Sequence, residues 1–242
     1  MKNTLVRRKL SDEVRIRLEE MIRDEVYPEG STLPSERDLM EMFDVGRPSI
    51  REALYALERM GLLRIASGER PKVIRPTPQH LLKSLSGTAN LLLEQPQGVA
   101  HFEQARLFME TSIARHAAEA ASDSQIEVLA DALARNEQAI PKARAFAITD
   151  VAFHRALTEI PGNPIFVSMH DALVDWLINQ RHLPSDPEVS NRKSFEGHVQ
   201  VYEAIRARDP QAAADAMRQH LEDAQRKFNT NKTERPNKEE IS

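Results

Sequence analysis

The sequence predicts a mainly α-helical protein in two parts: a small N-terminal domain that closes with a β-hairpin, and a longer antiparallel bundle made only of helices. Three observations support this prediction: two helical patterns lie close together within residues 33–63, two β-compatible runs follow Gly61, and helical periodicity fills most of the chain after residue 80. A chain of 242 residues can bury two cores. We expect a first domain at 1–76, a linker at 77–79, a bundle at 80–228 and a disordered polar tail at 229–242.

The first domain begins with an amphipathic helix, whose apolar positions are Val14, Leu18, Met21 and Ile22. A short helix follows Ser35, because the serine hydroxyl can accept from a backbone N–H one turn on and Asp38 can complete a capping box. One face of this short helix is expected to be buried through Leu39, Met42 and Phe43.

A second helix begins after a break at residues 44–46, and its first turn tolerates Pro48 because the N–H that proline lacks would be unpaired there. Its buried face is predicted to consist of Ile50, Ala53, Leu54 and Leu57. Arg47 and Arg51 occupy a neighbouring stripe at i and i+4. Such arginines can meet phosphates or span the O6 and N7 edge of guanine, although many ordinary solvated helices carry a similar pair.

The two short helices are followed by a predicted hairpin. Residues 62–65 and 72–75 are β-compatible, and Ser67 with Gly68 supplies a plausible tip between them. Two helices joined by a tight turn and followed by a hairpin form a winged helix-turn-helix domain.

The segments YPEGSTLPSER and VGRPSIREAL, with the Gly61-Leu62-Leu63 ending, closely resemble the N-terminal domain of GntR transcription regulators. Gly46 and Pro48 stand where many relatives have Ser and Thr. We expect a homodimer that binds double-stranded operator DNA. Two copies of the helix that carries Arg47 and Arg51 would contact two half-sites related by two-fold symmetry, which gives more contacts than one small domain can make. The resemblance implies operator contacts by Arg37, Arg47, Ser49, Arg51 and the wing tip around Gly68.

Composition fits a regulator better than a protein that coats nucleic acid. The net charge is -4, and the excess of acidic residues lies after residue 80. The chain has no cysteine, so disulfides and cysteine-type zinc sites are excluded. No apolar run approaches a membrane span and the N-terminus lacks the apolar core of a signal peptide, so a cytoplasmic protein is expected.

The bundle contains a possible metal site. Asp150 and His154 lie at i and i+4, so both point from one face of a helix. His198 and His220 fall on consecutive helices, since Asp209 and Pro210 look like an N-cap and a first helical residue. One aspartate with three histidines suits zinc above all, with nickel, manganese or iron as alternatives. Spacing alone is weak support, because a single histidine on an apolar face is more often structural.

The segments ITDVAFHRAL, PGNPIF and SFEGHVQVYEAIRARDPQAAADAMRQHL closely resemble the FCD ligand-binding domain in the FadR branch of the GntR family. This resemblance implies metal ligation by Asp150, His154, His198 and His220. It also implies that Arg106 faces an effector pocket, although an ion pair with Glu103 or Glu110 is an equal alternative. Arg181, after LVDWLINQ, is a weaker effector candidate, and the alternative is that it marks the C-terminus of its helix. The remaining histidines are expected to be structural or at the surface: His80, His101, His116, His170 and His182.

GERPKVIRP, GVAHFEQARLF, FHRALTEIPGNPIF and LVDWLI resemble the sialic-acid-responsive repressors of the FadR branch. The resemblance implies a repressor that releases DNA when N-acetylneuraminate binds. A sugar acid such as galactonate or a small hydroxy acid such as lactate remains an alternative effector. A metal-dependent enzyme is a further alternative, but the N-terminal domain argues against it and no segment supplies an evident general base. An architectural DNA-binding protein with a structural metal is a third reading.

Overall fold

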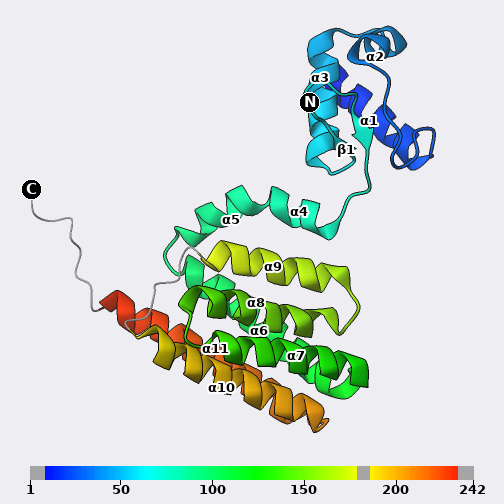
Figure 1. The fold of residues 1–242 in the computed structure, drawn as a ribbon. Coiled ribbons are helices and arrows are strands. Elements are labelled where there is room, and N and C mark those ends of the chain that lie inside the picture. Colours follow the sequence, from blue (N-terminus) through cyan, green and yellow to red (C-terminus); the bar gives the residue numbers. More distant parts are fainter. Residues whose placement is uncertain (1–8, 179–185, 234–242) are drawn as a thin grey trace, which may run out of the picture. The chain divides into compact units, whose positions relative to one another are not determined.

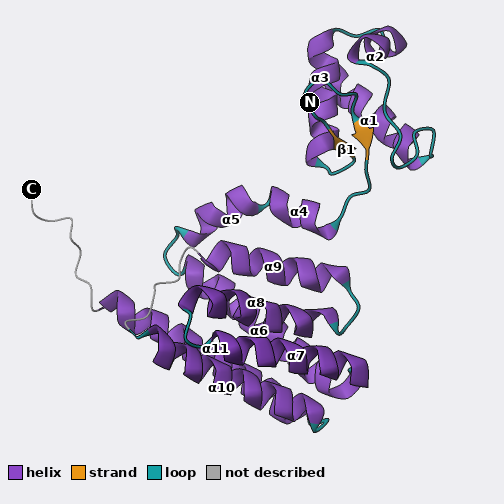
Figure 2. Ribbon diagram, in the orientation of Figure 1, coloured by secondary structure: helices purple, strands orange, loops and turns teal. Residues whose placement is uncertain are grey.

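The computed structural model describes residues 9–178 and 186–233, and these fold as two compact units that divide after Leu85 (Figure 1). The first unit combines helices with one small hairpin, and the second unit is built from helices (Figure 2). This confirms the predicted fold class, a winged helix-turn-helix domain followed by an all-α bundle.

The first unit consists of α1 (Leu10–Arg23), α2 (Glu36–Phe43), α3 (Arg47–Arg59), β1 (Leu63–Arg64), β2 (Lys72–Val73) and α4 (Pro78–Ser84). Its core brings together apolar residues from all three leading helices and the hairpin, including Val14, Leu18, Leu39, Ile50, Leu57, Leu63 and Val73. The four apolar positions predicted to be buried on α3 are all buried, so the other side of that helix is left for solvent or a ligand.

The start of α2 is fixed by the predicted capping box. The Ser35 hydroxyl accepts from the Asp38 N–H at 3.2 Å, and the Asp38 carboxylate accepts from the Ser35 N–H at 3.1 Å. Asp44 ends the helix in the left-handed conformation, at φ 47°. Met42 differs from the prediction because it is half exposed. Leu39 and Phe43, one turn apart, already form the packed stripe of this short helix.

The wing is a short antiparallel hairpin that pairs Leu63 with Val73 and Arg64 with Lys72. An isolated bridge from Thr32 to Lys72 ties the loop before α2 to the same hairpin. Gly68 lies at the tip with φ +79°, a left-handed conformation that glycine adopts without the steric cost of a side chain. The sequence therefore placed the hairpin and its tip correctly, although the strands are shorter than predicted.

α4 begins at Pro78, inside the segment 77–79 that the sequence suggested as a linker. The helix starts there because the Thr77 hydroxyl accepts from the His80 N–H and Pro78 occupies the first turn. His80 packs against the turn at Gly61, where an added Cβ would lie 3.1 Å from the His80 side chain. α4 therefore belongs with the winged domain, in agreement with the division after Leu85.

The second unit contains α5 (Ser86–Leu93), α6 (Gly98–Ala120), α7 (Asp123–Ala139), α8 (Ala143–Glu159), α9 (Pro164–Ile178), α10 (Pro187–Arg206) and α11 (Pro210–Thr233). The breaks between helices coincide with the proline, glycine and capping residues in the sequence. Ser122, Asp186 and Asp209 each accept from a backbone N–H in the first turn of the helix that follows.

Within this bundle, α6 packs along α11, α10 packs along α11, and α7 packs along α8 (Figure 1). The core between them includes Ala114, Leu129, Phe153, Leu157, Val201, Ile205 and Met217. α11 extends to Thr233, into the segment from residue 229 that was expected to be disordered, because no glycine or proline interrupts the helix before Pro236. No helix in the described part of the chain is long and apolar enough to span a bilayer.

Candidate functional site

Two groups of predicted functional residues lie in different units, and each is described by itself. In the first unit, Arg47 and Arg51 project from the first two turns of α3, with 62% and 57% of their side chains exposed. Both approach the carboxylate of Glu36 on α2, at Nε–oxygen distances of 3.6 Å for Arg47 and 2.9 Å for Arg51. The two arginines are therefore accessible and share one acidic partner.

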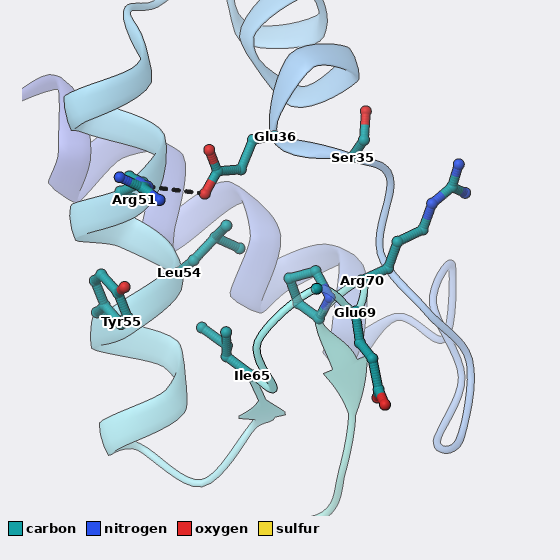
Figure 3. Close-up of a pocket in the computed structure, with 10 residues that line it drawn as sticks. Ser35, Glu36, Arg51, Leu54, Tyr55, Ile65, Glu69 and Arg70 are labelled. Atoms are coloured by element: carbon teal, nitrogen blue, oxygen red, sulfur yellow. Dashed lines mark hydrogen bonds and ion pairs between the residues drawn. The ribbon is translucent and has the colours of Figure 1, made fainter.

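α3, which we call the reading helix, and the wing meet at a pocket lined by Glu36, Arg51, Tyr55, Gly68 and Arg70, among others (Figure 3). The structure thus brings together Arg51 and Gly68, two of the predicted DNA contacts. Arg70 was not singled out in the sequence, although it follows the wing tip directly. It is exposed and forms no hydrogen bond or ion pair with any described residue, so it is a further candidate for a phosphate contact.

The other two predicted contacts lie apart from this pocket. Arg37 is on α2, where its Nε donates to Glu41 one turn on at 3.2 Å, and most of its side chain is exposed. Ser49 is in the first turn of α3, half-buried, and its backbone N–H donates to the Gly46 carbonyl. Neither residue lines the pocket between α3 and the wing.

In the second unit, the four predicted metal ligands converge. Asp150 and His154 come from α8, His198 from α10 and His220 from α11, and one donor atom of each lies within 4.8 Å of the others. The Nε2 atoms of His154 and His220 are 3.2 Å apart, and those of His154 and His198 are 3.3 Å apart. Asp150 Oδ1 is 3.4 Å from His198 Nε2.

These spacings fit a metal ion. Donors about 2.0–2.1 Å from a tetrahedral zinc ion would be about 3.3–3.4 Å from one another, which is close to the three distances above. All three imidazoles present Nε2 to the same point, and the three rings are buried. An acidic oxygen with three imidazole nitrogens is a donor set that borderline divalent ions accept. The residues therefore fit a transition-metal ion.

A second layer of hydrogen bonds orients the rings. His198 Nδ1 is 2.9 Å from Asn136 Oδ1, and the Asn136 amide donates to Thr149 Oγ1 at 3.0 Å. Since the Nδ1 of His198 has an acceptor, its Nε2 is the nitrogen without a proton and is available to a metal. Ser194 donates to Asp150 Oδ1 at 3.3 Å. Asn136 was not predicted, because it lies on α7, 62 positions before the histidine that it contacts.

His154 is supported by a buried ion pair. Its Nδ1 is 2.5 Å from Glu110 Oε2, and the other oxygen of Glu110 accepts from Arg106 Nε at 2.6 Å. The ion pair considered in the sequence is therefore present, between Arg106 and Glu110. The terminal nitrogens of Arg106 form no hydrogen bond with any described residue. Arg181 and His182 lie outside the described residues.

Burial and charge set the protonation of this cluster. Burial lowers the pKa of His198 and of His220 well below the ordinary value, and neighbouring imidazoles lower it further, so both rings are neutral near pH 7 and ready to ligate a metal. Burial alone would raise the pKa of Glu110, but Arg106 and His154 outweigh it and hold that pKa well below the ordinary value. Glu110 therefore remains a carboxylate.

Gly197 allows His220 to reach the site. A Cβ at Gly197 would lie 2.5 Å from His220 Nδ1, closer than real Cβ atoms approach, and 3.1 Å from its Cγ, which is a tight contact. Both residues line a surface groove between α10 and α11. The only sequence signal for this role is a glycine within the helical pattern directly before a ligand, in the segment FEGHV.

His170 also belongs to this region. It is fully buried on α9, its ring is stacked on that of His154 at a centroid distance of 6.4 Å, and its Nε2 has no hydrogen-bond partner in the described part of the chain. Burial lowers its pKa, so the ring is neutral. The sequence placed His170 among structural or surface residues, and its burial excludes the surface.

Replacing Gly197 with Ala should weaken metal binding. The new methyl group must displace the His220 ring, and a displaced ligand costs about tenfold or more in affinity. Competition with a chromophoric chelator measures this affinity. Gly87→Ala is the matched control, since a Cβ there meets no atom within 4 Å. Equal zinc affinity in the Gly197 and Gly87 variants would show that the close approach does not constrain the ligand.

The metal-free protein should lose stability as the pH falls below about 6.5. The folded-state pKa values of His170, His198 and His220 lie below 6.5, so in this range the unfolded chain takes up protons that the folded chain does not. The free energy of unfolding should fall by up to about 1.4 kcal/mol per pH unit for each histidine. Urea unfolding of chelator-treated protein between pH 7.5 and 5.5 measures the slope. His198→Gln should flatten it, and a level profile in the parent protein would contradict the assigned pKa directions.

Comparisons with known proteins agree with this architecture. Residues 10–73 match the family described as "Bacterial regulatory proteins, gntR family", and residues 102–223 match the "FCD domain". A protein called HTH-type transcriptional repressor NanR from Citrobacter rodentium (strain ICC168) is 51% identical over 219 residues, which cover 90% of this chain and 84% of that protein. Its namesake from Cronobacter sakazakii (strain ATCC BAA-894) is 50% identical over the same coverage.

A solved structure supports the same assignment. Streptococcus agalactiae GntR aligns with a TM-score of 0.60 and 27% identity, covering 89% of this chain and 99% of that one. Both halves of the sequence and the whole fold therefore point to one family. The chain belongs to the GntR family of bacterial transcription regulators, carries an FCD domain, and is a ligand-responsive DNA-binding regulator.

Proposed function

We propose that this regulator represses genes for the catabolism of sialic acid or a related sugar acid, and that it releases its operator when N-acetylneuraminate binds in the bundle beside a metal ion. The observation that carries the proposal is the convergence of one aspartate and three histidines in the bundle interior. The identity of about half the residues with repressors named NanR, and the resemblance to sialic-acid-responsive members, favour this effector over galactonate or lactate.

The metal would be held by Asp150, His154, His198 and His220, with zinc as the first candidate and nickel, manganese or iron as alternatives. When bound, a divalent ion that accepts a fifth or sixth ligand beyond these four would offer a carboxylate or hydroxyl oxygen a strong partner. The protein supplies the orientation of the ligands, since Glu110 and Asn136 fix two of the rings.

The charge of the buried cluster favours an anionic effector. The charges of Arg106 and Glu110 cancel, and His198 and His220 are neutral, which leaves Asp150 as the one acidic side chain of the four. A divalent cation would bring the cluster to a net charge of about plus one, because it adds two charges to the one carboxylate that remains. A single carboxylate would then restore neutrality, as expected for the binding of a monovalent acid.

Of two unpaired buried polar atoms, the one on His170 supports a ligand beside the cluster. His170 Nε2 and Thr111 Oγ1 are buried and have no hydrogen-bond partner among the described residues. Buried polar atoms are normally satisfied by protein, water or a ligand. His170 stacks on His154, whereas Thr111 comes one residue after Glu110 on α6 and therefore lies on a different face of that helix. Arg106 remains a proposed effector contact through its terminal nitrogens, and Arg181 remains a proposed contact from the sequence alone.

For the DNA contacts we propose Arg37, Arg47, Ser49, Arg51 and Gly68, with Arg70 added from the wing. Two copies of the reading helix would engage two half-sites in a homodimer. An effector that binds one arrangement of the dimer more tightly must shift the population toward it, so release needs no contact between effector and DNA.

N-acetylneuraminate should weaken operator binding by zinc-loaded protein. A duplex selected from a random pool by the protein serves as the operator, and fluorescence anisotropy measures the dissociation constant. We expect an increase of about 5- to 150-fold, the usual range for allosteric coupling. The His154→Ala variant lacks one of the proposed metal ligands, so N-acetylneuraminate should no longer weaken its binding to the operator. The zinc-loaded parent with galactonate and lactate provides the comparison.

The outcomes separate the alternatives. Release by galactonate or lactate but not by N-acetylneuraminate would replace the effector and keep the regulator. If none of the acids changes the affinity for the operator, the result would favour an architectural DNA-binding protein with a structural metal. If mass spectrometry shows that the protein converts the added acid into a product, the result would favour a metal-dependent enzyme.

His170→Phe should weaken effector binding and leave metal binding unchanged. Phenylalanine keeps an aromatic side chain but removes both ring nitrogens, the unpaired Nε2 and the Nδ1 that lies 3.4 Å from Asp171. Loss of a hydrogen bond to a charged group costs about tenfold or more in affinity. Calorimetry with N-acetylneuraminate measures the first effect, and chelator competition measures the second. His101→Phe, at an exposed position, is the control. Unchanged heat and affinity in the His170 variant would remove this residue from the effector site.

A further inference from the structure

Glu36 occupies an unusual place for an acidic residue on a surface that binds DNA. It is the first residue of α2, directly after the Ser35 cap, and its side chain reaches across to the reading helix (Figure 3). One carboxylate oxygen lies 2.9 Å from Arg51 Nε, and the other lies 3.6 Å from Arg47 Nε. A single carboxylate therefore bridges two arginines that stand one turn apart on α3.

The atoms used in this bridge matter. A guanidinium carries five N–H donors, and guanine is read by two of them at once through its O6 and N7 atoms. Both arginines face Glu36 with Nε, the nitrogen nearest the main chain. The outer edge of each guanidinium is thus left for a base, while the carboxylate restricts the rotation of the long side chain.

A purely structural role explains the bridge poorly. Exposed ion pairs contribute little to folding stability, and α2 and α3 are already joined through buried Leu39, Ile50 and Leu54. A carboxylate near the DNA backbone also repels phosphates, which weakens binding to every duplex. This cost is offset where the two arginines gain good contacts with bases.

We propose that Glu36 is a specificity-determining residue of this regulator. It holds Arg47 and Arg51 in position for the operator, and its negative charge penalises binding to duplexes that leave the arginines without base contacts. Other acidic residues of the helix-turn-helix have different partners: Glu41 pairs with Arg37 on the same helix, and Glu52 pairs with Lys9.

The test compares Glu36→Ala and Glu36→Gln with Glu52→Gln in the full-length protein. Glu52→Gln removes the same charge from α3 at a position that does not touch the reading arginines. Anisotropy titrations use the selected operator duplex and a random-sequence duplex of equal length, at two salt concentrations. Thermal unfolding confirms that each variant is folded, and the glutamine variant preserves the shape of the side chain.

We expect Glu36→Ala to lower the ratio of operator affinity to random-duplex affinity about tenfold, within the range of one bidentate base contact. Random-duplex affinity should stay level or rise. Glu36→Gln should lower the ratio by less, because the amide oxygen still accepts from Arg51. Glu52→Gln should strengthen both complexes by a similar factor and keep the ratio.

A double-mutant cycle separates positioning from a general effect of charge. If Glu36 acts through the reading helix, Glu36→Ala should lower the ratio much less in a protein that already carries Arg51→Ala. The proposal is overturned if Glu36→Ala changes both duplex affinities by the same factor, as Glu52→Gln is expected to do. It is also overturned if the full effect persists without Arg51.

Discussion

The bundle depends on the approach of four donor atoms from three helices to one buried point. Asp150, His154, His198 and His220 can remain there without strong repulsion because His198 and His220 are neutral and only one of the four side chains is acidic. The surrounding polar residues, Glu110 and Asn136 among them, bind the outer nitrogens of the rings. Apolar packing of α6, α8, α10 and α11 then encloses the whole group.

The two units control their charged side chains by opposite physical means. In the bundle, desolvation makes each uncompensated charge costly, so Arg106 and Glu110 pair tightly, and Glu110 also orients His154 through a hydrogen bond. On the winged domain, Arg47 and Arg51 are more than half exposed and share one carboxylate, so they could exchange this partner for the phosphates or bases of DNA. Side chains that are held rigidly suit the binding of a small ligand in a protein interior. Side chains that are held loosely suit a large, hydrated interface with DNA.

The sequence predicted the features that arise within one helix or one turn. The capping box at Ser35, the buried stripe of α3, the wing tip at Gly68 and the shared face of Asp150 and His154 all follow from local spacing. Contacts between distant segments were less visible. Glu110 was weighed only as a partner of Arg106, and its bond to His154 spans 44 positions. Asn136 and Gly197 act through the packing of neighbouring helices, which periodicity alone does not specify.

The helix that follows the wing changes where the winged domain should be considered to end. α4 starts with a capped proline turn, and His80 covers the glycine turn between α3 and β1. A fragment that ends in the proline-rich stretch near residue 76 would lack His80, and the turn at Gly61 would lose its contact with the His80 side chain. A fragment intended to carry the operator-reading module alone should therefore extend through Leu85, so that the module keeps its own last helix.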